Sequence, residues 1–206
     1  MTHSLARIVA ILALPLLAAC AGTAKQKAPE AVPGYEGVQD GAFFIEPVSA
    51  QYLQDGNIRT EVAYTGPEAP GTVVVDTFAR KLYLVNEGGT ATRYPIAVGR
   101  EGLSFRGTGT VGRKAEWPSW QPTANMIRTR PDLYAAYAGG LPGGLMNPLG
   151  ARALYLYRGS RDTMFRIHGT SDAASVGHAT SAGCIRLFNQ DAIDLYNKVP
   201  NGTRVK

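Results

Sequence analysis

The 206-residue sequence contains few residues that could bind a transition metal. It has three histidines and two cysteines. Loss of an N-terminal leader would leave only His168 and His178, ten positions apart and outside any His-Glu-x-x-His pattern. Zinc peptidases need a closer set of nitrogen and carboxylate ligands. The sequence therefore argues against a metal-dependent hydrolase, and we expect no metal and no cofactor.

The N-terminus lacks an apolar run long enough to cross a membrane. The run at residues 8–19 follows Arg7 and is twelve residues long. As a helix it would span roughly 18 Å, whereas a bilayer core is about 30 Å thick. This pattern is typical of a signal peptide. We therefore expect residues 1–19 to be removed on export.

The end of this run, Leu17-Ala18-Ala19-Cys20, resembles the lipobox of bacterial lipoproteins. The resemblance implies lipidation of Cys20, which would anchor the mature chain to a membrane. Ala21 stands where an aspartate would retain the protein at the inner membrane, which implies sorting to the outer membrane. The expected location is thus the periplasm, as an outer-membrane lipoprotein. An ordinary secretory leader cleaved near Ala21 is the alternative.

Charge and cysteine content exclude other classes. Loss of residues 1–19 would remove only the charge of Arg7 and leave a formal net charge of +4, a modest basic excess that suits an anionic polymer. No run of lysine or arginine interleaved with aromatic residues indicates nucleic-acid binding. Two cysteines in an exported protein would ordinarily suggest a disulfide. Here we expect a free thiol at Cys184, with a Cys20–Cys184 bridge as the alternative.

Composition divides the mature chain into three parts. Residues 20–41 are rich in Ala, Gly, Pro, Lys and Glu without apolar periodicity, which predicts a flexible tether. Ordered structure is expected from about Phe43, with residues 42–69 forming an N-terminal extension. Residues 70–206 form the main domain, which is long enough for one compact core.

The main domain shows mostly β-type patterns. Short segments rich in Val, Ile, Tyr and Leu alternate with turn residues and predict strands. These segments are residues 72–76, 81–85, 93–98, 111–114, 153–157, 165–168 and 203–205. One helix is predicted over residues 191–199, with Asn189 as its cap. The expected fold is mainly β, either a two-sheet sandwich or a distorted barrel.

A long irregular segment, residues 115–150, separates the early strands from the late ones. It contains Trp117, Trp120 and several Pro and Gly residues. Loops of this length in compact domains are more often functional than not. Its tryptophans either wall a substrate groove or fasten the loop to the sheet, and the sequence does not distinguish these.

The most informative feature is the pairing of His168 with Cys184, sixteen positions later. Both lie in apolar or glycine-rich surroundings typical of strand ends. A thiol is mostly protonated at neutral pH, and an imidazole beside it favours the reactive thiolate. The two residues are therefore predicted to be a nucleophile and its base.

These residues resemble the L,D-transpeptidase catalytic domain, the YkuD domain of bacterial peptidoglycan enzymes. The resemblance covers roughly residues 70–206. The matching features are His168-Gly169-Thr170, Ser181, Gly183-Cys184-Ile185-Arg186-Leu187, Asp191, Gly202-Thr203-x-Val205, Asn147-Pro148-Leu149-Gly150 and Ala153-Leu154-Tyr155-Leu156. It implies that Cys184 attacks the bond between a diamino acid and D-alanine in a peptide stem, forms a thioester and transfers the acyl group to an amine.

Further roles follow within that chemistry. The Gly169 carbonyl is expected to accept a hydrogen bond from the far ring nitrogen of His168 and fix its tautomer. The amides of Gly183 and Cys184 are candidates for an oxyanion hole. Ser181 is a candidate for orienting the site or donating to substrate, with a turn cap as the alternative.

The substrate side of the site is less defined. Arg186 either binds a substrate carboxylate or braces its loop. Trp117 and Trp120 are candidate substrate contacts. Ala182 replaces a histidine or serine of many family members and supplies no donor, and His178 is expected to be a surface histidine.

The acyl acceptor stays open at this level. An amine of a neighbouring stem would give a 3-3 cross-link, a lysine of an outer-membrane protein would give covalent anchoring, and a free D-amino acid would give exchange. Water would make the protein an L,D-carboxypeptidase. A non-catalytic wall-binding lipoprotein is a further alternative, although it would not need both His168 and Cys184. We expect transpeptidation, with peptidoglycan stem peptides as the partner.

Overall fold

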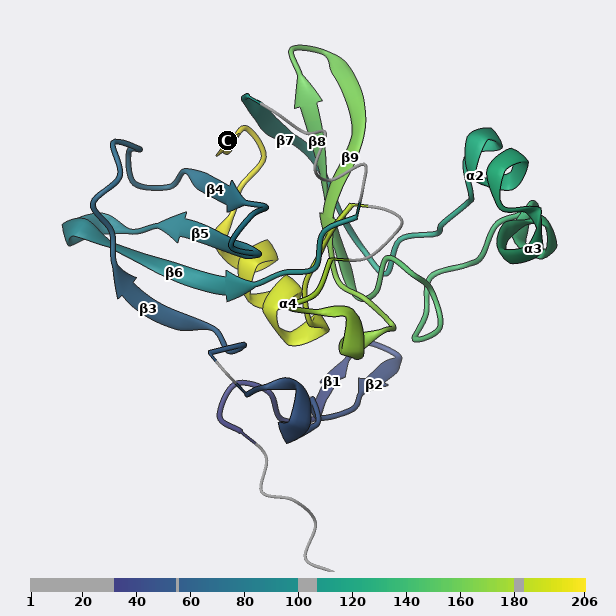
Figure 1. The fold of residues 1–206 in the computed structure, drawn as a ribbon, viewed down its shortest axis with the longest axis horizontal. Coiled ribbons are helices and arrows are strands. Elements are labelled where there is room, and N and C mark those ends of the chain that lie inside the picture. The colour runs from purple at the N-terminus through teal and green to yellow at the C-terminus, as the bar shows by residue number, and fades with distance from the viewer. Residues whose placement is uncertain (1–31, 55, 100–106, 180–183) are drawn as a thin grey trace, which may run out of the picture.

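The computed structural model describes residues 32–54, 56–99, 107–179 and 184–206 (Figure 1). The predictions for the signal peptide, Cys20, Ser181 and Gly183 lie outside these residues, as does one half of the alternative Cys20–Cys184 bridge. Within the described part of the chain, no helix is both long and apolar enough to cross a membrane.

Nine strands form the main sheet of the described chain. Its order is β10-β9-β8-β7-β11-β4-β5-β6-β3. The strands are β3 Thr60–Ala63, β4 Val73–Asp76, β5 Lys81–Val85, β6 Thr90–Pro95, β7 Gly109–Glu116, β8 Arg152–Arg158, β9 Arg161–His168, β10 Ile185–Arg186 and β11 Arg204–Val205. The mainly β prediction is confirmed, and each predicted strand overlaps an observed one.

The sheet closes on itself at Arg186. This residue belongs to β10 at one end of the strand order, and Ala97 follows β6 near the other end. Their backbones exchange two hydrogen bonds, each 2.9 Å long. Strand pairing therefore continues from β10 through the sheet to the chain just after β6 and back to β10. Of the two predicted architectures, this pairing fits the distorted barrel.

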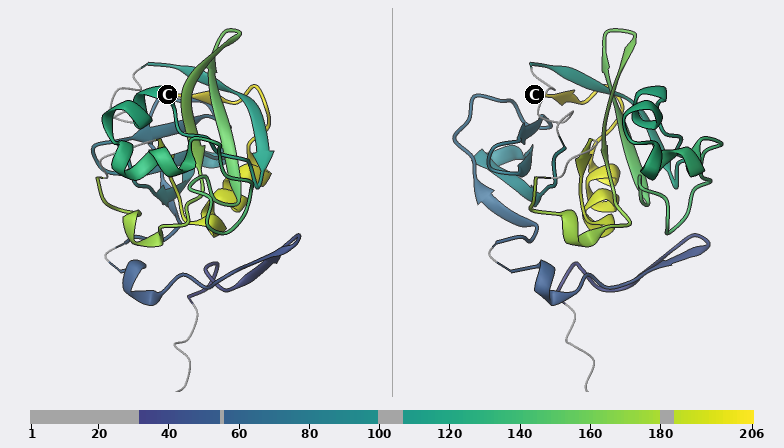
Figure 2. Two further views of the ribbon diagram at one scale, coloured as in Figure 1. Left: turned by 90° about the vertical axis from the view of Figure 1, so that its right-hand side faces the viewer. Right: turned by 45° about the vertical axis from the view of Figure 1, so that its right-hand side comes forward.

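Helix α4, Asn189–Lys198, lies between the two halves of the sheet (Figures 1 and 2). Ala192 and Leu195 on its inner face, and Val199 directly after it, are almost fully buried and pack against strand side chains in the main core. Spacings of three and four residues put such side chains on one face of a helix. The predicted helix is confirmed, starting two residues earlier than expected.

The prediction that Asn189 caps this helix is wrong. Phe188 occupies the cap position, and Asn189 lies in the first turn. Its amide instead binds backbone groups of Ala151 and Thr170. The sequence pattern identified a polar residue at the right place but not the competing partners that the fold brings to it.

The segment over residues 115–150 is partly helical rather than irregular. It contains α2 Ala124–Thr129, α3 Pro131–Tyr134 and the 3-10 turn η3 Ala135–Tyr137. The Thr123 hydroxyl caps α2 by accepting a hydrogen bond from Met126 N at 3.2 Å, and Pro131 occupies the first turn of α3. These short helices project from the side of the barrel (Figure 2). Pro and Gly content concealed them in the sequence.

The N-terminal extension is ordered from an earlier point than the expected boundary near Phe43. It comprises a hairpin of β1 Val38–Asp40 and β2 Phe43–Ile45, the 3-10 turn η1 Ala50–Tyr52, and β3. Tyr35 is only 1% exposed and stacks edge-on against Phe188, with ring centroids 5.6 Å apart. The extension packs below α4 (Figure 1) and adds β3 to the edge of the main sheet beside β6.

Asp40 and Arg152 fasten this extension to the barrel. The Arg152 guanidinium donates to both carboxylate oxygens of Asp40, at 2.6 and 2.8 Å, and its side chain is 6% exposed. The indole of Trp117 donates to the same carboxylate at 2.8 Å. These donors hold the pKa of Asp40 below its usual range. A two-point charged contact of this kind fixes both distance and orientation.

We expect Asp40→Ala to destabilise the protein by about 2–4 kcal/mol, because it leaves the buried Arg152 charge without its main partner. We expect a smaller loss than the largest values known for broken buried ion pairs, because Glu116 lies 3.8 Å from the same guanidinium and partly offsets its charge. Urea unfolding measures the change. Asp132→Ala breaks a solvent-exposed pair with Arg130 and serves as control, with no measurable effect expected. Equal losses in the two variants would contradict the prediction.

Candidate active site

Parallel pairing of β9 and β10 places the predicted nucleophile and base on neighbouring segments of the sheet. Ile185 pairs with Ile167 and Arg186 with His168, while Leu187 N donates to His168 O at 2.8 Å. Ile167 and Ile185 are fully buried in the main core. Side chains alternate along strands, so Cys184 and His168 both belong to the opposite face. Extending the register by one residue sets Cys184 opposite Arg166, two positions before His168 on β9.

The Cys184 sulfur lies beside the backbone of β9. The sulfur is 3.7 Å from the Met164 carbonyl oxygen, and the residue is half-buried. Met164 has a left-handed backbone, with φ 65°, where β8 and β9 shift register. The Asp162 carboxylate accepts from Met164 N at 2.8 Å and steadies this irregular turn of β9. A strand irregularity thus contributes to the thiol's surroundings.

His168 has a defined orientation. Its side chain is buried, and Nδ1 lies 2.5 Å from the Gly169 carbonyl oxygen. A carbonyl oxygen can only accept, so Nδ1 carries the proton and Nε2 keeps its lone pair in the neutral ring. The hydrogen bond expected between Gly169 and the histidine is present. The ring therefore offers Nε2 as its proton-accepting atom.

The charge state of His168 follows from its surroundings. Burial, together with the cationic Arg186 and Arg166, lowers the pKa of this imidazole to about 3, against opposing contributions from the Gly169 and Leu149 carbonyls. The ring is consequently neutral near pH 7. The two cations oppose a positive charge on the ring until negative charge develops nearby.

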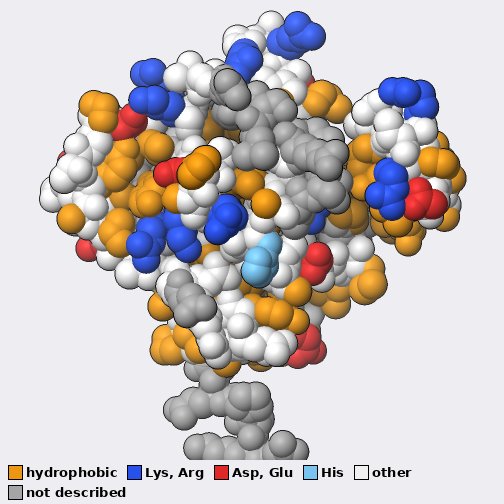
Figure 3. Space-filling view, in the orientation of Figure 1, with side chains coloured by type: hydrophobic (Ala, Val, Ile, Leu, Met, Phe, Trp, Pro, Cys, Tyr) orange, Lys and Arg blue, Asp and Glu red, His pale blue; other side chains and the backbone are white. Residues whose placement is uncertain are grey.

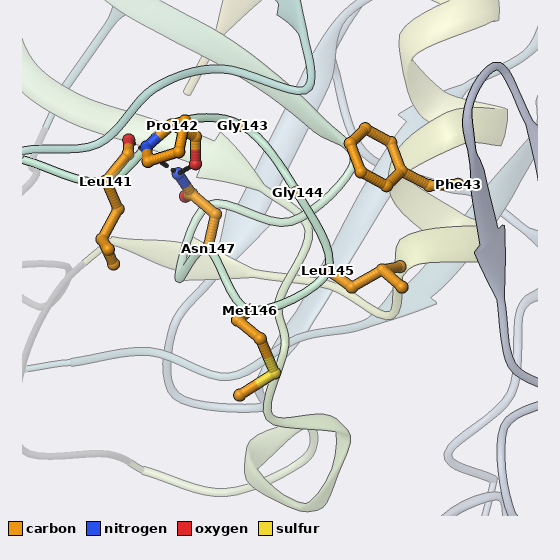
Figure 4. A pocket seen from close by; sticks show the side chains of 8 residues that line it. All are labelled: Phe43, Leu141, Pro142, Gly143, Gly144, Leu145, Met146 and Asn147. Carbon is orange, nitrogen blue, oxygen red and sulfur yellow. Dashed lines mark hydrogen bonds between the residues drawn. The ribbon is translucent and has the colours of Figure 1, made fainter.

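Asn147 organises the loop end that reaches His168. Its buried amide donates to the carbonyls of Pro118, at 3.0 Å, and Pro142, at 2.9 Å, and accepts from Leu149 N at 2.9 Å. The same turn lines a pocket of about 290 Å³ (Figure 4). The pocket is lined by Phe43, Leu141, Pro142, Gly143, Gly144, Leu145, Met146 and Asn147. The same loop therefore lines an apolar pocket and supplies the Leu149 carbonyl that interacts with His168.

The two tryptophans contact other parts of the chain. Trp117 packs against Phe43 with tilted rings whose centroids are 4.4 Å apart, and its indole also bonds to Asp40. Trp120 lies 6.3 Å from the rings of both Tyr134 and Tyr137. These contacts favour the fastening role over the groove wall, and substrate contact by either residue stays a prediction.

Other predicted residues fall as follows. Arg186 is half-buried in β10, in register with His168. His178 is exposed, as expected for a surface histidine. Figure 3 shows Lys and Arg side chains gathered near the middle of one face, beside a histidine. Among the described residues, no three His, Cys, Asp or Glu side chains form a possible metal site.

The sequence assigned no role in the site to Arg166, Asn147 or the Met164 carbonyl, and it assigned Asn189 only as a helix cap. The alternation along β9 could have placed Arg166 on the face of His168. Asn147 was noted only as part of a motif. The contact between the Met164 carbonyl and Cys184 could not be predicted from the sequence, because a backbone group makes it whatever the side chain is.

His168 makes stability depend on pH. Its folded pKa lies below the unfolded value near 6.5, so the unfolded chain binds the extra proton first as pH falls. The associated stability is present above pH 6.5 and is lost on acidification toward pH 3. Relative to His168→Gln, the wild type should lose about 1–2 kcal/mol more between pH 7 and pH 5. Urea unfolding at each pH measures both slopes, and parallel slopes would count against a buried neutral imidazole.

Comparison with known proteins identifies the family. Residues 70–206 match the family model described as the L,D-transpeptidase catalytic domain, YkuD. A Fuscovulum blasticum protein named as an L,D-transpeptidase is 38% identical over 136 residues, 65% of this chain and 67% of its own length. Escherichia coli ErfK/SrfK, named "Probable L,D-transpeptidase", is 36% identical over 138 residues, 66% of this chain but only 43% of that protein.

A solved structure extends the comparison to the fold. A Brucella melitensis protein, described as a carnitine operon oxidoreductase, is 46% identical and superposes with a TM-score of 0.53 over 73% of this chain and 93% of its own. The oxidoreductase description concerns that protein. The present chain spans less than half of the Escherichia coli relative and belongs, by its residues 70–206, to the L,D-transpeptidase catalytic domain family.

Proposed function

We propose that this protein is a peptidoglycan L,D-transpeptidase in which Cys184 is the nucleophile and His168 the general base. The supporting observation is the β9–β10 pairing, which sets a half-buried thiol and a buried imidazole on the same face. The Nδ1 bond to Gly169 directs the basic Nε2 atom away from that carbonyl. These features match the requirements of thiol acyl transfer.

The reaction has two balanced halves. Cys184 Sγ attacks the carbonyl between a diamino acid and D-alanine while His168 Nε2 accepts the thiol proton. The tetrahedral intermediate collapses to a thioester, and the imidazolium returns the proton to the departing D-alanine amine. An acceptor amine then attacks the thioester, its proton passes through His168, and the thiol is restored. A positioned base of this kind contributes roughly 10²–10⁴ in rate.

Electrostatics favour this sequence of charges. The neutral His168 gains a proton only while an oxyanion forms at the attacked carbonyl, and that anion offsets the repulsion from Arg166 and Arg186. The amides of Gly183 and Cys184 are the proposed oxyanion hole, and Ser181 a proposed orienting group. Arg186 is the proposed partner for a stem carboxylate, because a guanidinium binds carboxylates with two parallel bonds.

The acceptor decides among related activities. We favour an amine, either of a neighbouring stem, giving a 3-3 cross-link, or of an outer-membrane protein, giving covalent attachment. The second candidate is an L,D-carboxypeptidase, in which water attacks the same thioester. Both share the acylation half-reaction, so the contacts around His168 support them equally. A non-catalytic wall-binding lipoprotein is a less favoured alternative, since the His168–Gly169 bond would then serve no purpose.

The activity test uses the full chain in mild detergent with purified tetrapeptide muropeptides and mass spectrometry of the products. A form beginning at residue 42 is unsuitable, because it would lack Tyr35 and Asp40. We expect dimers linked between diamino residues, with release of D-alanine. Cys184→Ala should abolish them, and His168→Gln should lower the rate about 10²–10⁴-fold.

Other products would redirect the proposal. Tripeptide without dimers would indicate carboxypeptidase action. Addition of an outer-membrane protein as acceptor, followed by muropeptide-modified lysine, would indicate covalent anchoring. Absence of every Cys184-dependent product under both conditions would overturn the enzymatic proposal and favour wall binding.

The proposed location is the periplasmic face of the outer membrane, with a lipid on Cys20. It is supported by the Leu17-Ala18-Ala19-Cys20 segment after an apolar run. Residues 20–31 precede the first described residue, so the lipid and the barrel would be joined by a short linker. The proposed division of the chain is therefore residues 1–19 as signal peptide, an acylated linker, the N-terminal extension and the catalytic domain from residue 70.

Cys20→Ser should prevent lipidation and move the protein from the membrane fraction to the soluble periplasm. Labelling with a fatty-acid probe and fractionation would measure this. The catalytic rate on muropeptides should stay within about twofold, because the substitution leaves the barrel unchanged. Continued labelling, or membrane retention equal to the wild type, would refute the lipid anchor. Ser4→Ala, in the leader before the apolar run, is the control and should leave the labelling unchanged.

A further inference from the structure

We infer that Asn189 is a positioning residue that holds the backbone after His168 so that the Gly169 carbonyl stays on Nδ1 and Nε2 stays available as the base. The inference deepens the proposed function and rests on it for the catalytic consequence. Asn189 touches neither the thiol nor the imidazole in the contacts described here. It acts through the two backbone segments between which its amide lies.

The Asn189 amide connects two loops, one through a backbone N–H group and the other through a backbone carbonyl. Its Oδ1 accepts a hydrogen bond from Ala151 N at 2.9 Å, and its Nδ2 donates to Thr170 O at 3.0 Å. One loop offers a donor and the other an acceptor, so the side chain must present both functions at fixed spacing. A carboxylate of the same shape lacks the donor, and an apolar side chain lacks both.

Close packing prevents the amide from moving. Gly150 and Gly169 lie against it, and a Cβ atom built on either glycine would overlap Asn189 Oδ1. Gly150 also has a left-handed backbone, with φ 61°. The two glycines therefore make the room that the amide fills, which gives a physical reason for glycine on each side of Asn189.

The remaining backbone bonds show why the Asn189 contact matters for His168. Leu187 N holds His168 O at 2.8 Å, and Arg152 O holds Gly169 N at 2.9 Å. Asn189 holds the next carbonyl, that of Thr170. The Gly169 carbonyl lies between these fixed points and faces Nδ1 at 2.5 Å. Because glycine resists rotation least, releasing Thr170 would allow the Gly169 carbonyl to turn away from the ring.

Helix α4 gives Asn189 a rigid base. Two residues later, Asp191 is fully buried and binds the Arg59 guanidinium at 2.9 Å and the Tyr35 hydroxyl at 3.0 Å. Ala192 and Leu195 fix the same helix in the core. The first turn of α4 thus holds the amide against the His168 turn from a stable element, as precise sites require.

The consequence is chemical. The proton position on a histidine is set by the hydrogen bond that the other ring nitrogen makes. Without the Gly169 carbonyl on Nδ1, the ring can carry its proton on Nε2, where it cannot accept one from Cys184. Loss of an orienting partner of a catalytic histidine costs as much as about 10⁴ in rate when the tautomer is wrong. An indirect loss through Asn189 should be smaller, about 10²-fold.

The test compares Asn189→Asp and Asn189→Ala with Gln190→Ala in the full chain. Gln190 is the adjacent residue of α4, is 8% exposed, and its amide also makes two bonds to backbone carbonyls, those of Glu36 and Glu46. Those carbonyls belong to the N-terminal extension. The control therefore removes a similar buried amide without touching the His168 turn.

Two readouts separate positioning from folding. Nitrogen-15 NMR of labelled histidine reports which ring nitrogen of His168 is protonated, and steady-state kinetics on tetrapeptide muropeptides separates kcat from KM. In both Asn189 variants we expect a shift of the proton toward Nε2 and a fall in kcat of about 10²-fold, with KM changed less than about threefold. Gln190→Ala should keep the Nδ1 proton and a near-normal kcat, although it lowers stability.

The outcomes are distinct. An unchanged tautomer in both Asn189 variants would overturn the inference, as would an equal loss of kcat in Gln190→Ala. If Asn189→Ala does not fold, Asn189→Asp, which keeps the volume and the bond from Ala151, carries the test. If the wild type shows no Cys184-dependent activity, the proposed function fails, while the NMR comparison still decides whether Asn189 sets the tautomer.

Discussion

The paired backbone hydrogen bonds between Arg186 and Ala97 are the constraint on which the rest of the site depends. They close the strand order at β10, a strand of only two residues that also pairs with β9. Because Cys184 immediately precedes β10, the closure also fixes the position of Cys184 at the edge of the barrel. The same pairing aligns Arg186 with His168. Strand β10 therefore pairs with β9 on one side and with Ala97 on the other. The predicted reactive residues lie at this closure, which we call the seam.

Around this seam, the site is built from backbone groups more than from side chains. The carbonyls of Gly169, Leu149 and Met164 contact or influence the two reactive residues. Asn147 and Asn189 then hold the turns that supply two of these carbonyls. Amides suit this task because one side chain can satisfy a backbone donor and a backbone acceptor together. The reactive pair is thus set by main-chain geometry, with amide side chains bracing it.

The sequence predicted the strands, the helix α4 and the reactive pair because each depends on local pattern or on a specific short motif. The short apolar runs of β5 and β8, and the helical spacing of Ala192 and Leu195, are local patterns that predict these elements. Contacts between residues that are far apart in the sequence have no such local pattern. The role of Asn189 depends on Ala151, which is 38 residues away, and that of Asp40 on Arg152, which is 112 away. No local sequence pattern predicts such partners.

The short helices α2 and α3 were concealed for a different reason. The segments around them are rich in Pro and Gly, α2 has only six residues, and α3 has only four. Isolated helices of such length are marginal, so they form only where capping and neighbouring contacts support them. Trp120 beside Tyr134 provides one such contact. Tertiary context therefore decided their conformation.

The position of β3 has a consequence for how this family domain can be separated from the rest of the chain. The family match begins at residue 70, whereas β3 pairs along β6 from residues 60–63. A cut at residue 70 would uncover the β6 edge, whose unpaired backbone groups can recruit strands from other molecules. It would also remove Arg59 and leave the buried Asp191 without its cation. The segment before residue 70 thus covers the β6 edge and supplies the cation for a buried carboxylate of the family domain, so the folded unit extends beyond the recognised domain.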